Sequence, residues 1–383
     1  MHLLRLTSAA ALVLSLSGSV CFGQHYKQTD LVSSEGADGD KQLINPWGMS
    51  RGSGSPWWVS DNGTGLSTLY NGAGMKQGLV VTIPAAVAGK TGSPTGIIFN
   101  GSKTDFLLSA GDPAIFLFST IDGTIAGWNP AVGLEKGQKP PSTHAVTVVK
   151  TKDGSVYTGL TSAEVDGKRY LYAANFSKGR VDVWDSKFKP VTFQTDPWEL
   201  PPFTDDLLPP EYVPFNAQAI GDEIVVTYAL HQPGMPVETD GPGLGYVDVY
   251  SATGELRLHL EHGDWLNAPW GVALAPLDFG KFSHSLLIGQ FAGGGTTESS
   301  GWIAAYNLTT GHFEGLLKDA AGKPLAIQGI WALSPGNVSP GNLDAAASPA
   351  AEVYFTAGPK AGSEGLFGYL TAIPTELVQG NDQ

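Results

Sequence analysis

The chain has 383 residues, 42% of them hydrophobic and only 15% charged, and its net charge is −14. This balance excludes a disordered chain, which combines low hydrophobicity with high charge. The acidic excess and the lack of a Lys/Arg cluster argue against nucleic acids and anionic membrane surfaces as partners. The 50 glycines and the many aromatic residues indicate short strands joined by tight turns.

Residues 1–23 are expected to form a cleaved signal peptide. Arg5 supplies a positive charge, residues 3–16 are mostly apolar, and Cys21-Phe22-Gly23 offers a cleavage site before Gln24. The apolar run is too short to cross a bilayer, so we expect a secreted or periplasmic protein without a membrane span. The alternative is a lipoprotein signal at the cysteine, although Val20 stands where that signal has a small residue. Cleavage after residue 23 would leave no cysteine and therefore no disulfide.

Residues 24–375 repeat one pattern six times, and residues 376–383 follow as a C-terminal tail. Each copy opens with two residues, a third-place residue that is usually glycine, and an apolar residue. The six segments are Pro46-Trp47-Gly48-Met49, Pro94-Thr95-Gly96-Ile97, Tyr157-Thr158-Gly159-Leu160, Pro214-Phe215-Asn216-Ala217, Pro269-Trp270-Gly271-Val272 and Ile327-Gln328-Gly329-Ile330. In the fourth copy the third place is occupied by Asn216 instead of glycine.

A short apolar run follows each opening segment, as is typical of a buried strand, and a third strand follows that run. The third strand carries an aromatic residue at one fixed place. These aromatic residues are Tyr70, Trp128, Trp184, Tyr250, Tyr306 and Tyr369. A fourth strand is expected in the first five copies, whereas the sixth copy stops after its third strand, at Leu370.

Four strands in each of six copies predict an all-β, six-bladed β-propeller with four-stranded blades. We expect residues 29–33 to supply the missing outer strand of the sixth blade and to close the ring. The third-place glycines are expected where the six innermost strands converge on the axis, because glycine permits a close approach of backbones. The aromatic residues are expected to fill the space between blades.

The predicted ligand face lies over blades 4 to 6. In propellers, by analogy, ligands bind where loops lead into the first strand and join the second strand to the third. Blades 1 to 3 have tight turns there, whereas residues 195–214 and 230–244 of blade 4, 293–301 of blade 5 and 359–365 of blade 6 form longer loops. The candidate residues are Trp47, Asp61, Asn62, Asn175, Asn216, His231, Asp240, Asn267, Trp270 and Gln290. The two blade 4 loops also carry Asp205 and Glu238.

Oxygen-bearing side chains near the predicted axis form a candidate calcium site. Ca²⁺ prefers carboxylate and amide oxygens. The candidate ligands are Asp61, Asn175, Asn216 and Asn267. The alternative is that these side chains cap turns and satisfy backbone groups at strand ends. The tryptophans near this face likewise either stack on a flat ligand or pack under the loops.

Catalytic signatures are absent from the sequence. It contains no Gly-x-Ser-x-Gly elbow, no His-Glu-x-x-His motif and no phosphate-binding loop. His259 and His262 are three residues apart, but His259 falls in a predicted strand, so the two are not expected to bind a metal together. No catalytic residue can therefore be assigned.

Several segments form a recognisable set. They are Asn45-Pro46-Trp47-Gly48, Asp61-Asn62-Gly63-Thr64-Gly65, Pro94-Thr95-Gly96-Ile97-Ile98-Phe99-Asn100, Asp122-Gly123-Thr124-Ile125-Ala126-Gly127-Trp128-Asn129, Ala268-Pro269-Trp270-Gly271-Val272-Ala273-Leu274-Ala275-Pro276 and Phe355-Thr356-Ala357-Gly358. Together they resemble a family of secreted, mainly bacterial, conserved hypothetical proteins that is similar to propellers of the NHL-repeat type. The resemblance covers nearly all of the mature chain and implies the fold and export, but it brings no established activity.

The chain departs from that family at two second-strand ends. Gly289-Gln290-Phe291 stands where Gly-Asn-Phe is expected, and Ala174-Asn175-Phe176 stands where Ala-Asp-Phe is expected. If a ring of such residues held a metal, both changes would weaken it in this chain.

The leading hypothesis is a secreted, monomeric binding or scaffold module for a small molecule, a glycan or an extracellular protein. The alternative is a metal-dependent hydrolase or lactonase in which an axial Ca²⁺ polarises a carbonyl group. Redox activity with a quinone cofactor is a third reading, because propellers also host such cofactors. Whether the protein is an enzyme stays open at this point.

Overall fold

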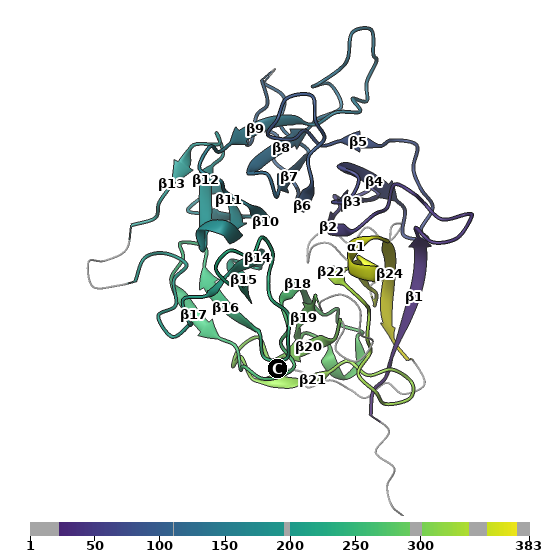
Figure 1. Ribbon diagram of the computed structural model, residues 1–383, viewed down its shortest axis with the longest axis vertical. Coiled ribbons are helices and arrows are strands. Elements are labelled where there is room, and N and C mark those ends of the chain that lie inside the picture. Colours follow the sequence, from purple (N-terminus) through teal and green to yellow (C-terminus); the bar gives the residue numbers. More distant parts are fainter. Residues whose placement is uncertain (1–22, 110, 195–199, 292–300, 337–350, 374–383) are drawn as a thin grey trace, which may run out of the picture.

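Six four-stranded antiparallel sheets stand side by side as a closed ring in the computed structural model (Figure 1). The structure describes residues 23–109, 111–194, 200–291, 301–336 and 351–373. The arrangement confirms the predicted all-β, six-bladed propeller. None of the helices in the described part of the chain is long and apolar enough to span a membrane.

The first three blades follow one another in chain order. Blade 1 contains β2 (Pro46–Ser50), β3 (Trp57–Asp61), β4 (Leu66–Tyr70) and β5 (Val81–Thr82). Blade 2 contains β6 (Pro94–Phe99), β7 (Phe116–Thr120), β8 (Thr124–Trp128) and β9 (Val146–Lys150). Blade 3 contains β10 (Tyr157–Val165), β11 (Lys168–Asn175), the short helix η1 (Phe176–Lys178), β12 (Arg180–Asp185) and β13 (Pro190–Val191).

The last three blades complete the ring. Blade 4 contains β14 (Tyr212–Ile220), β15 (Glu223–Leu230), β16 (Gly245–Ser251) and β17 (Leu256–His259). Blade 5 contains β18 (Pro269–Leu274), η2 (Gly280–Phe282), β19 (Leu286–Gln290), β20 (Ile303–Tyr306) and β21 (Phe313–Leu316). Blade 6 contains β22 (Ile330–Pro335), β23 (Val353–Ala357), α1 (Pro359–Gly362), β24 (Leu366–Ala372) and, as its outer strand, β1 (Tyr26–Ser33).

Blade 6 joins the two ends of the chain. β1 runs antiparallel to β24, with Tyr26 opposite Ala372 and Ser33 opposite Leu366. This pairing confirms the predicted closing strand, which starts three residues earlier than the sequence suggested. The Tyr26 ring is buried 4.8 Å from that of Phe279 in blade 5, and its hydroxyl donates a hydrogen bond of 3.0 Å to the Phe279 carbonyl oxygen. The first strand is therefore fastened to both of the last two blades.

At the axis, the inner strands touch through their third-place residues. A Cβ atom added at Gly48, Gly96, Gly159 or Gly271 would lie closer than 3.0 Å to an atom of the next blade's inner strand. Asn216 is accommodated because its Nδ2 donates a 2.8 Å hydrogen bond to a carbonyl oxygen of blade 5. The prediction that glycine permits the close approach is confirmed at these four positions.

Blade 6 departs from the predicted repeat. The pattern predicts Gly329 at its third place, but β22 begins only at Ile330, which lies opposite Ala357 as the first residue of the opening segment does in other blades. The third place therefore belongs to Ala332. Gly329 lies just before the strand with a φ of 67°, a left-handed conformation that glycine adopts without strain.

A backbone irregularity recurs in every inner strand. The pairing with the second strand shifts register around the second and third places in all six blades. Such a bulge removes an N–H group from the ladder. In three blades a hydroxyl on the second strand accepts this N–H at 3.1 Å: Gly96 to Ser119, Asn216 to Thr227 and Ala332 to Thr356.

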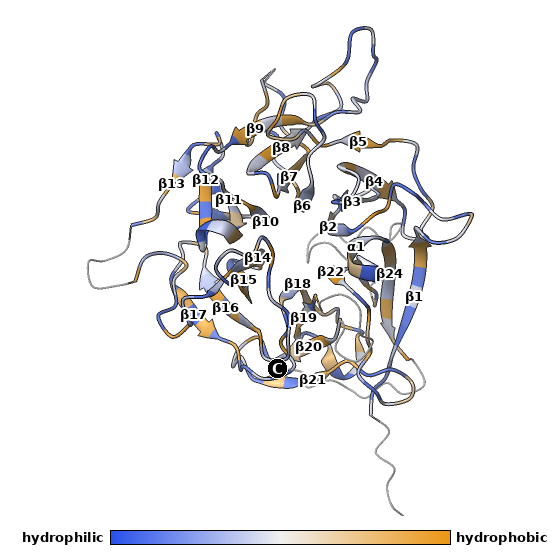
Figure 2. Cartoon of the chain, viewed as in Figure 1, coloured by the Kyte–Doolittle hydropathy of each residue, from blue (hydrophilic) through white to orange (hydrophobic). Residues whose placement is uncertain are grey.

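The third-strand aromatic residues pack between neighbouring blades. Trp128 lies 4.6 Å from Trp58 of blade 1, and Tyr70 lies 5.6 Å from Phe367 of blade 6. Blade 6 is again the exception, because Leu370 takes the equivalent position and Tyr369 is one residue off register. Hydrophobic residues concentrate in the strands and hydrophilic ones in the loops (Figure 2), so each sheet is buried against its neighbours.

We expect Gly96→Ala to lower the free energy of unfolding by about 1–3 kcal/mol, because the added methyl group would overlap the backbone of Leu160 in a packed hub. The matched control is Gly78→Ala, where nothing lies within 4 Å of the added Cβ. Chemical denaturation of both variants measures the difference. Equal stabilities would show that the hub tolerates side chains at the third place.

Candidate functional site

An aromatic plug fills the axis of the ring. It consists of Trp47, Phe215, Trp270 and Trp331, which occupy the second place of their inner strands and are at most 8% exposed. Trp47 stacks on Trp331 with ring centroids 3.7 Å apart, and the Phe215 and Trp270 centroids lie 6.3 and 6.1 Å from that of Trp47. Trp270 Nε1 donates to the Thr158 carbonyl oxygen at 2.9 Å. Trp47 and Trp270 thus pack in the structure's core.

Two of the four candidate calcium ligands are held by partners within their own blades. In blade 1, Asp61 is fully buried and its Oδ2 accepts a 2.9 Å hydrogen bond from the Thr68 backbone N–H. Burial raises the pKa of Asp61 well above its usual value. In blade 3, the Asn175 Nδ2 donates to Asp182 Oδ2 at 2.7 Å and to Ser155 Oγ at 3.0 Å. Asn175 thus bonds to polar groups of its own blade, whereas the second carboxyl oxygen of Asp61, Oδ1, is buried without a hydrogen-bond partner among the described residues.

The other two candidate ligands connect blades 4 and 5. Asn216 donates to the Trp270 carbonyl oxygen, as described above, and its amide is buried. Asn267 accepts a 2.9 Å hydrogen bond on Oδ1 from the Gly241 backbone N–H. Its own backbone N–H donates to Gln290 Oε1 at 2.9 Å. The structure therefore brings Asn267 and Gln290 together with the loop that follows β15.

Asn62 lies at the same end of the ring, in the tight turn of blade 1. Its Nδ2 donates to the Pro94 carbonyl oxygen at 3.2 Å, and its Oδ1 accepts from Asn45 Nδ2 at 3.4 Å. Asn45 Oδ1 in turn accepts a 2.9 Å hydrogen bond from Trp331 Nε1. These amides tie blades 1, 2 and 6 to the aromatic plug.

The loop between β15 and β16, residues 231–244, has a narrow, hydrogen-bonded neck. The Thr239 N–H donates to the Leu230 carbonyl oxygen at 2.8 Å. His231 lies beside this neck, with its ring 4.6 Å from that of Phe176 and its Nε2 2.9 Å from the Met235 carbonyl oxygen. The neck fixes the base of the loop, while residues 232–237 are exposed.

Two carboxyl groups with raised pKa values, Glu238 and Asp240, flank Thr239 of the neck. Burial raises the pKa of Glu238 to about 7, with a smaller contribution from the negative charge of Asp240. Burial also raises the pKa of Asp240 to about 6. Its Oδ1 is buried and has no hydrogen-bond partner among the described residues. Carboxyl groups with such shifts mark candidate binding or catalytic sites.

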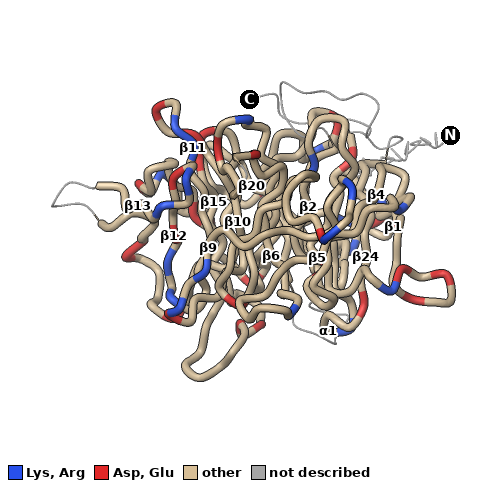
Figure 3. The backbone as a smooth tube through the Cα atoms, turned by 90° about the horizontal axis from the view of Figure 1, so that it is seen from above, with Lys and Arg blue, Asp and Glu red and all other residues tan. Residues whose placement is uncertain are grey.

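Charge is absent from the inner strands around which this site is built. The inner strands of blades 4 and 5, β14 and β18, carry no charged residue. Charged residues lie mainly on loops and outer strands (Figure 3). Glu298, in the predicted blade 5 loop, lies outside the described residues. The candidate site that the structure supports is therefore the 231–244 loop with Asn267 and Gln290.

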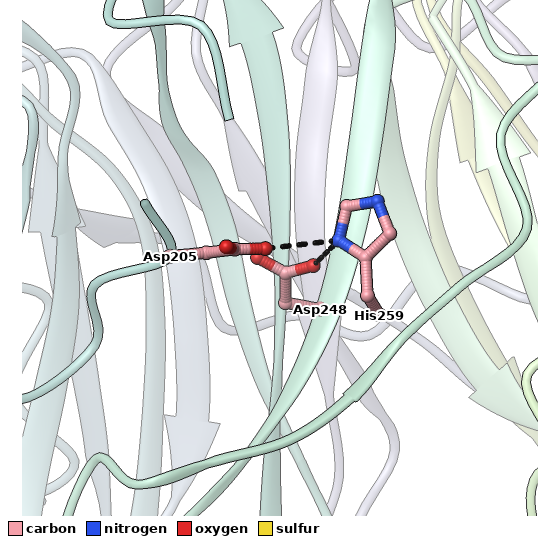
Figure 4. Close-up of side chains that lie close together, drawn as sticks. All are labelled: Asp205, Asp248 and His259. Carbon is pink, nitrogen blue, oxygen red and sulfur yellow. Dashed lines mark hydrogen bonds and ion pairs between the residues drawn. The ribbon is translucent and has the colours of Figure 1, made fainter. Parts of the chain in front are cut away.

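The sequence reasoning missed a polar cluster in the outer half of blade 4. Asp248 on β16 lies directly opposite His259 on β17, and the segment leading to β14 adds Asp205 (Figure 4). His259 was placed in a strand, but its register against β16 was not predicted. An alignment of the third and fourth strands of the blades would have indicated that Asp248 lies opposite His259.

Comparisons with known proteins identify relatives without assigning an activity. No family model matches the chain. Two uncharacterised proteins of Acanthamoeba polyphaga mimivirus are similar: one is 29% identical over 343 residues, 86% of this chain and 81% of its own, and the other is 27% identical over 313 residues, 79% and 71% respectively.

Two solved structures align with most of the chain. A protein of unknown function from Bacteroides thetaiotaomicron aligns over 92% of this chain and 77% of its own, with a TM-score of 0.52 and 11% identity. A streptogramin B lyase aligns over 93% of this chain and 100% of its own at a TM-score of 0.47 and 11% identity. At 11% identity, the likeness to the protein from Bacteroides thetaiotaomicron extends to the fold alone.

The raised pKa values predict a pH-dependent stability. Between about pH 4.5 and 7, folded Glu238 holds its proton while the unfolded group has lost it, and Asp240 behaves in the same way between about pH 3.8 and 6. The folded state binds more protons, so its stability falls as pH rises through this range. Glu238→Gln with Asp240→Asn should lessen that fall in urea unfolding at pH 5 and pH 8. Glu135→Gln, an exposed control, should keep the wild-type difference.

Proposed function

We propose that the protein is a binding module whose ligand lies at the hub end of blades 4 and 5, against the 231–244 loop. The observation that carries the proposal is the buried Asp240 Oδ1, which has no hydrogen-bond partner among the described residues. A buried acceptor left unpaired destabilises a fold. A ligand that donates a hydrogen bond to this oxygen removes that penalty.

The loop's composition supports a ligand with both polar and apolar surfaces. Met235 and Val237 are 46% and 53% exposed at the tip of the loop. Glu238 and Asp240 lie where the tip meets the neck, and at mildly acidic pH both favour the neutral form, which can also donate. Hydroxyl groups beside an apolar ring face are the chemistry of glycans, so we propose a glycan as the ligand class.

The base of the 231–244 loop is held rigidly, which favours ligand binding. The Leu230–Thr239 pair and the hydrogen bond from Gly241 to Asn267 hold the loop at two points. The aromatic plug closes the axis behind it. A preorganised loop over a packed hub loses little conformational freedom when a ligand binds.

We further propose that residues 1–23 direct export, as the charged start and apolar run support. These residues lie outside the described part, apart from Gly23. Mass spectrometry of the protein recovered from the medium or periplasm of an expressing host tests this: a mature form that begins at Gln24 supports it, and retention of residue 1 contradicts it.

The binding proposal is tested by trimming the loop. Replacing residues 232–237 by two glycines keeps the Leu230–Thr239 pair and the Gly241–Asn267 bond. On a glycan array, followed by titration of the best ligand, we expect the trimmed protein to bind at least about tenfold more weakly, a loss of about 1.4 kcal/mol.

The control is an equal trimming of residues 134–139, in the loop between β8 and β9. This loop lies at the opposite end of its blade from the turns that join second and third strands, and it is largely exposed. Its removal should leave the affinity unchanged. Wild-type affinity in the 232–237 variant would contradict the proposed face.

A further inference from the structure

The polar cluster of blade 4 consists of Asp205, Asp248 and His259. His259 Nδ1 lies 2.6 Å from Asp248 Oδ1 and 3.0 Å from Asp205 Oδ2, and both carboxylate side chains are completely buried (Figure 4). The imidazole is 30% exposed. Three donor atoms from three separate segments of the chain thus converge on one point.

The remaining carboxylate oxygens are already occupied. Asp205 Oδ1 accepts a 2.8 Å hydrogen bond from the Leu207 N–H. Asp248 Oδ2 accepts a 3.0 Å hydrogen bond from the Tyr250 hydroxyl, which lies 2.7 Å from that of Tyr228. These partners fix both carboxylates in orientation, as outer partners of metal ligands do. Only the oxygens aimed at His259 are left to bind something else.

One proton on His259 Nδ1 cannot form hydrogen bonds to both carboxylates at once. Nδ1 carries at most one proton, and its short contact to Asp248 uses it. Asp205 Oδ2 lies 3.0 Å from Nδ1 but takes part in no hydrogen bond, and it is fully buried. The contact between Asp205 Oδ2 and His259 Nδ1 is therefore an ion pair without a hydrogen bond. A buried oxygen that lacks a hydrogen bond destabilises the fold.

The cluster also lacks positive charge. Among the described residues no Lys or Arg forms an ion pair with Asp205 or Asp248. With both carboxylates ionised, the cluster carries a net charge of −1 or −2, depending on the imidazole. Burial of uncompensated charge is costly.

We propose that Asp205, Asp248 and His259 bind a divalent transition-metal ion, for which Zn²⁺ is the best match. The ion replaces the Nδ1 proton, and its two positive charges neutralise the two carboxylates. One imidazole nitrogen and two carboxylate oxygens suit Zn²⁺, whereas Mg²⁺ and Ca²⁺ prefer oxygen alone. Ligand atoms around tetrahedral Zn²⁺ lie about 3.4 Å apart, so the distances of 2.6 and 3.0 Å from Nδ1 to the two carboxylate oxygens need to lengthen by less than about 1 Å.

The ion would fasten a long connection to its blade. Asp205 belongs to the segment that leads into β14, whereas Asp248 and His259 belong to β16 and β17. The same segment is anchored close by, where the Phe203 N–H donates to the Gly254 carbonyl oxygen at 2.8 Å. This site is separate from the proposed ligand face, so either proposal stands if the other fails.

Isothermal titration of Zn²⁺ into chelator-treated, full-length protein tests the site. We expect one ion per chain, and an affinity at least about 100-fold lower in Asp205→Asn and His259→Ala, since loss of even an outer partner of a metal ligand costs about 10–100-fold. Asp205→Asn keeps the shape of the side chain and so addresses binding even if His259→Ala misfolds. Zn²⁺ should also raise the thermal midpoint of the wild type and not of these variants.

The matched control is His312→Ala, because His312 is an exposed histidine 3.4 Å from the Glu261 carboxylate. It should bind Zn²⁺ as the wild type does. Tyr250→Phe, which removes the outer hydrogen bond to Asp248 together with the contact to the Tyr228 hydroxyl, should bind about 10–100-fold more weakly. Absence of Zn²⁺ binding by the wild type, or wild-type binding by Asp205→Asn, would overturn the proposal.

Discussion

The close approach of six inner strands at one axis is the constraint on which the rest of the structure depends. Where the strands meet, four third-place residues have no side chain, and Asn216 is tolerated because its amide bonds to the next blade. Each inner strand bulges at this point, and in four of the six blades the second-place residue is an aromatic side chain of the plug. The region around the axis therefore consists mainly of packed side chains, and the polar clusters lie on the loops and outer strands.

Blade 4 carries both of the polar clusters described above. One of its loops carries Glu238 and Asp240 near the hub, and another brings Asp205 to the outer strands. In both places carboxyl groups are partly or wholly removed from water, which is unfavourable unless a donor or a cation is supplied. The rigid sheets can hold such groups in place because the core between blades, rather than the polar groups, stabilises the ring.

The sixfold sequence repeat allowed the fold to be predicted, but positions that depart from the repeat could not be recognised from the sequence. The blade number, the four-stranded blades and the N-terminal closing strand follow from spacing and apolar runs. Gly329 was misassigned because a turn glycine stands three residues before the true third place, Ala332, and sequence alone does not separate the two. The axial tryptophans were left open between packing and ligand stacking. Asp205 and His259 were not connected, because their contact depends on strand register and on the path of a long loop.

The pairing of β1 with β24 has a consequence for how the molecule is made. During synthesis β1 has no partner until β24, Leu366–Ala372, has been made, because β24 is the strand with which it pairs. Closing the ring therefore requires a contact between segments more than 300 residues apart, as in the pair of Ser33 and Leu366, and contacts of such long sequence separation slow folding. Until β1 and β24 pair, the unpaired edges of these two strands can form hydrogen bonds with other chains.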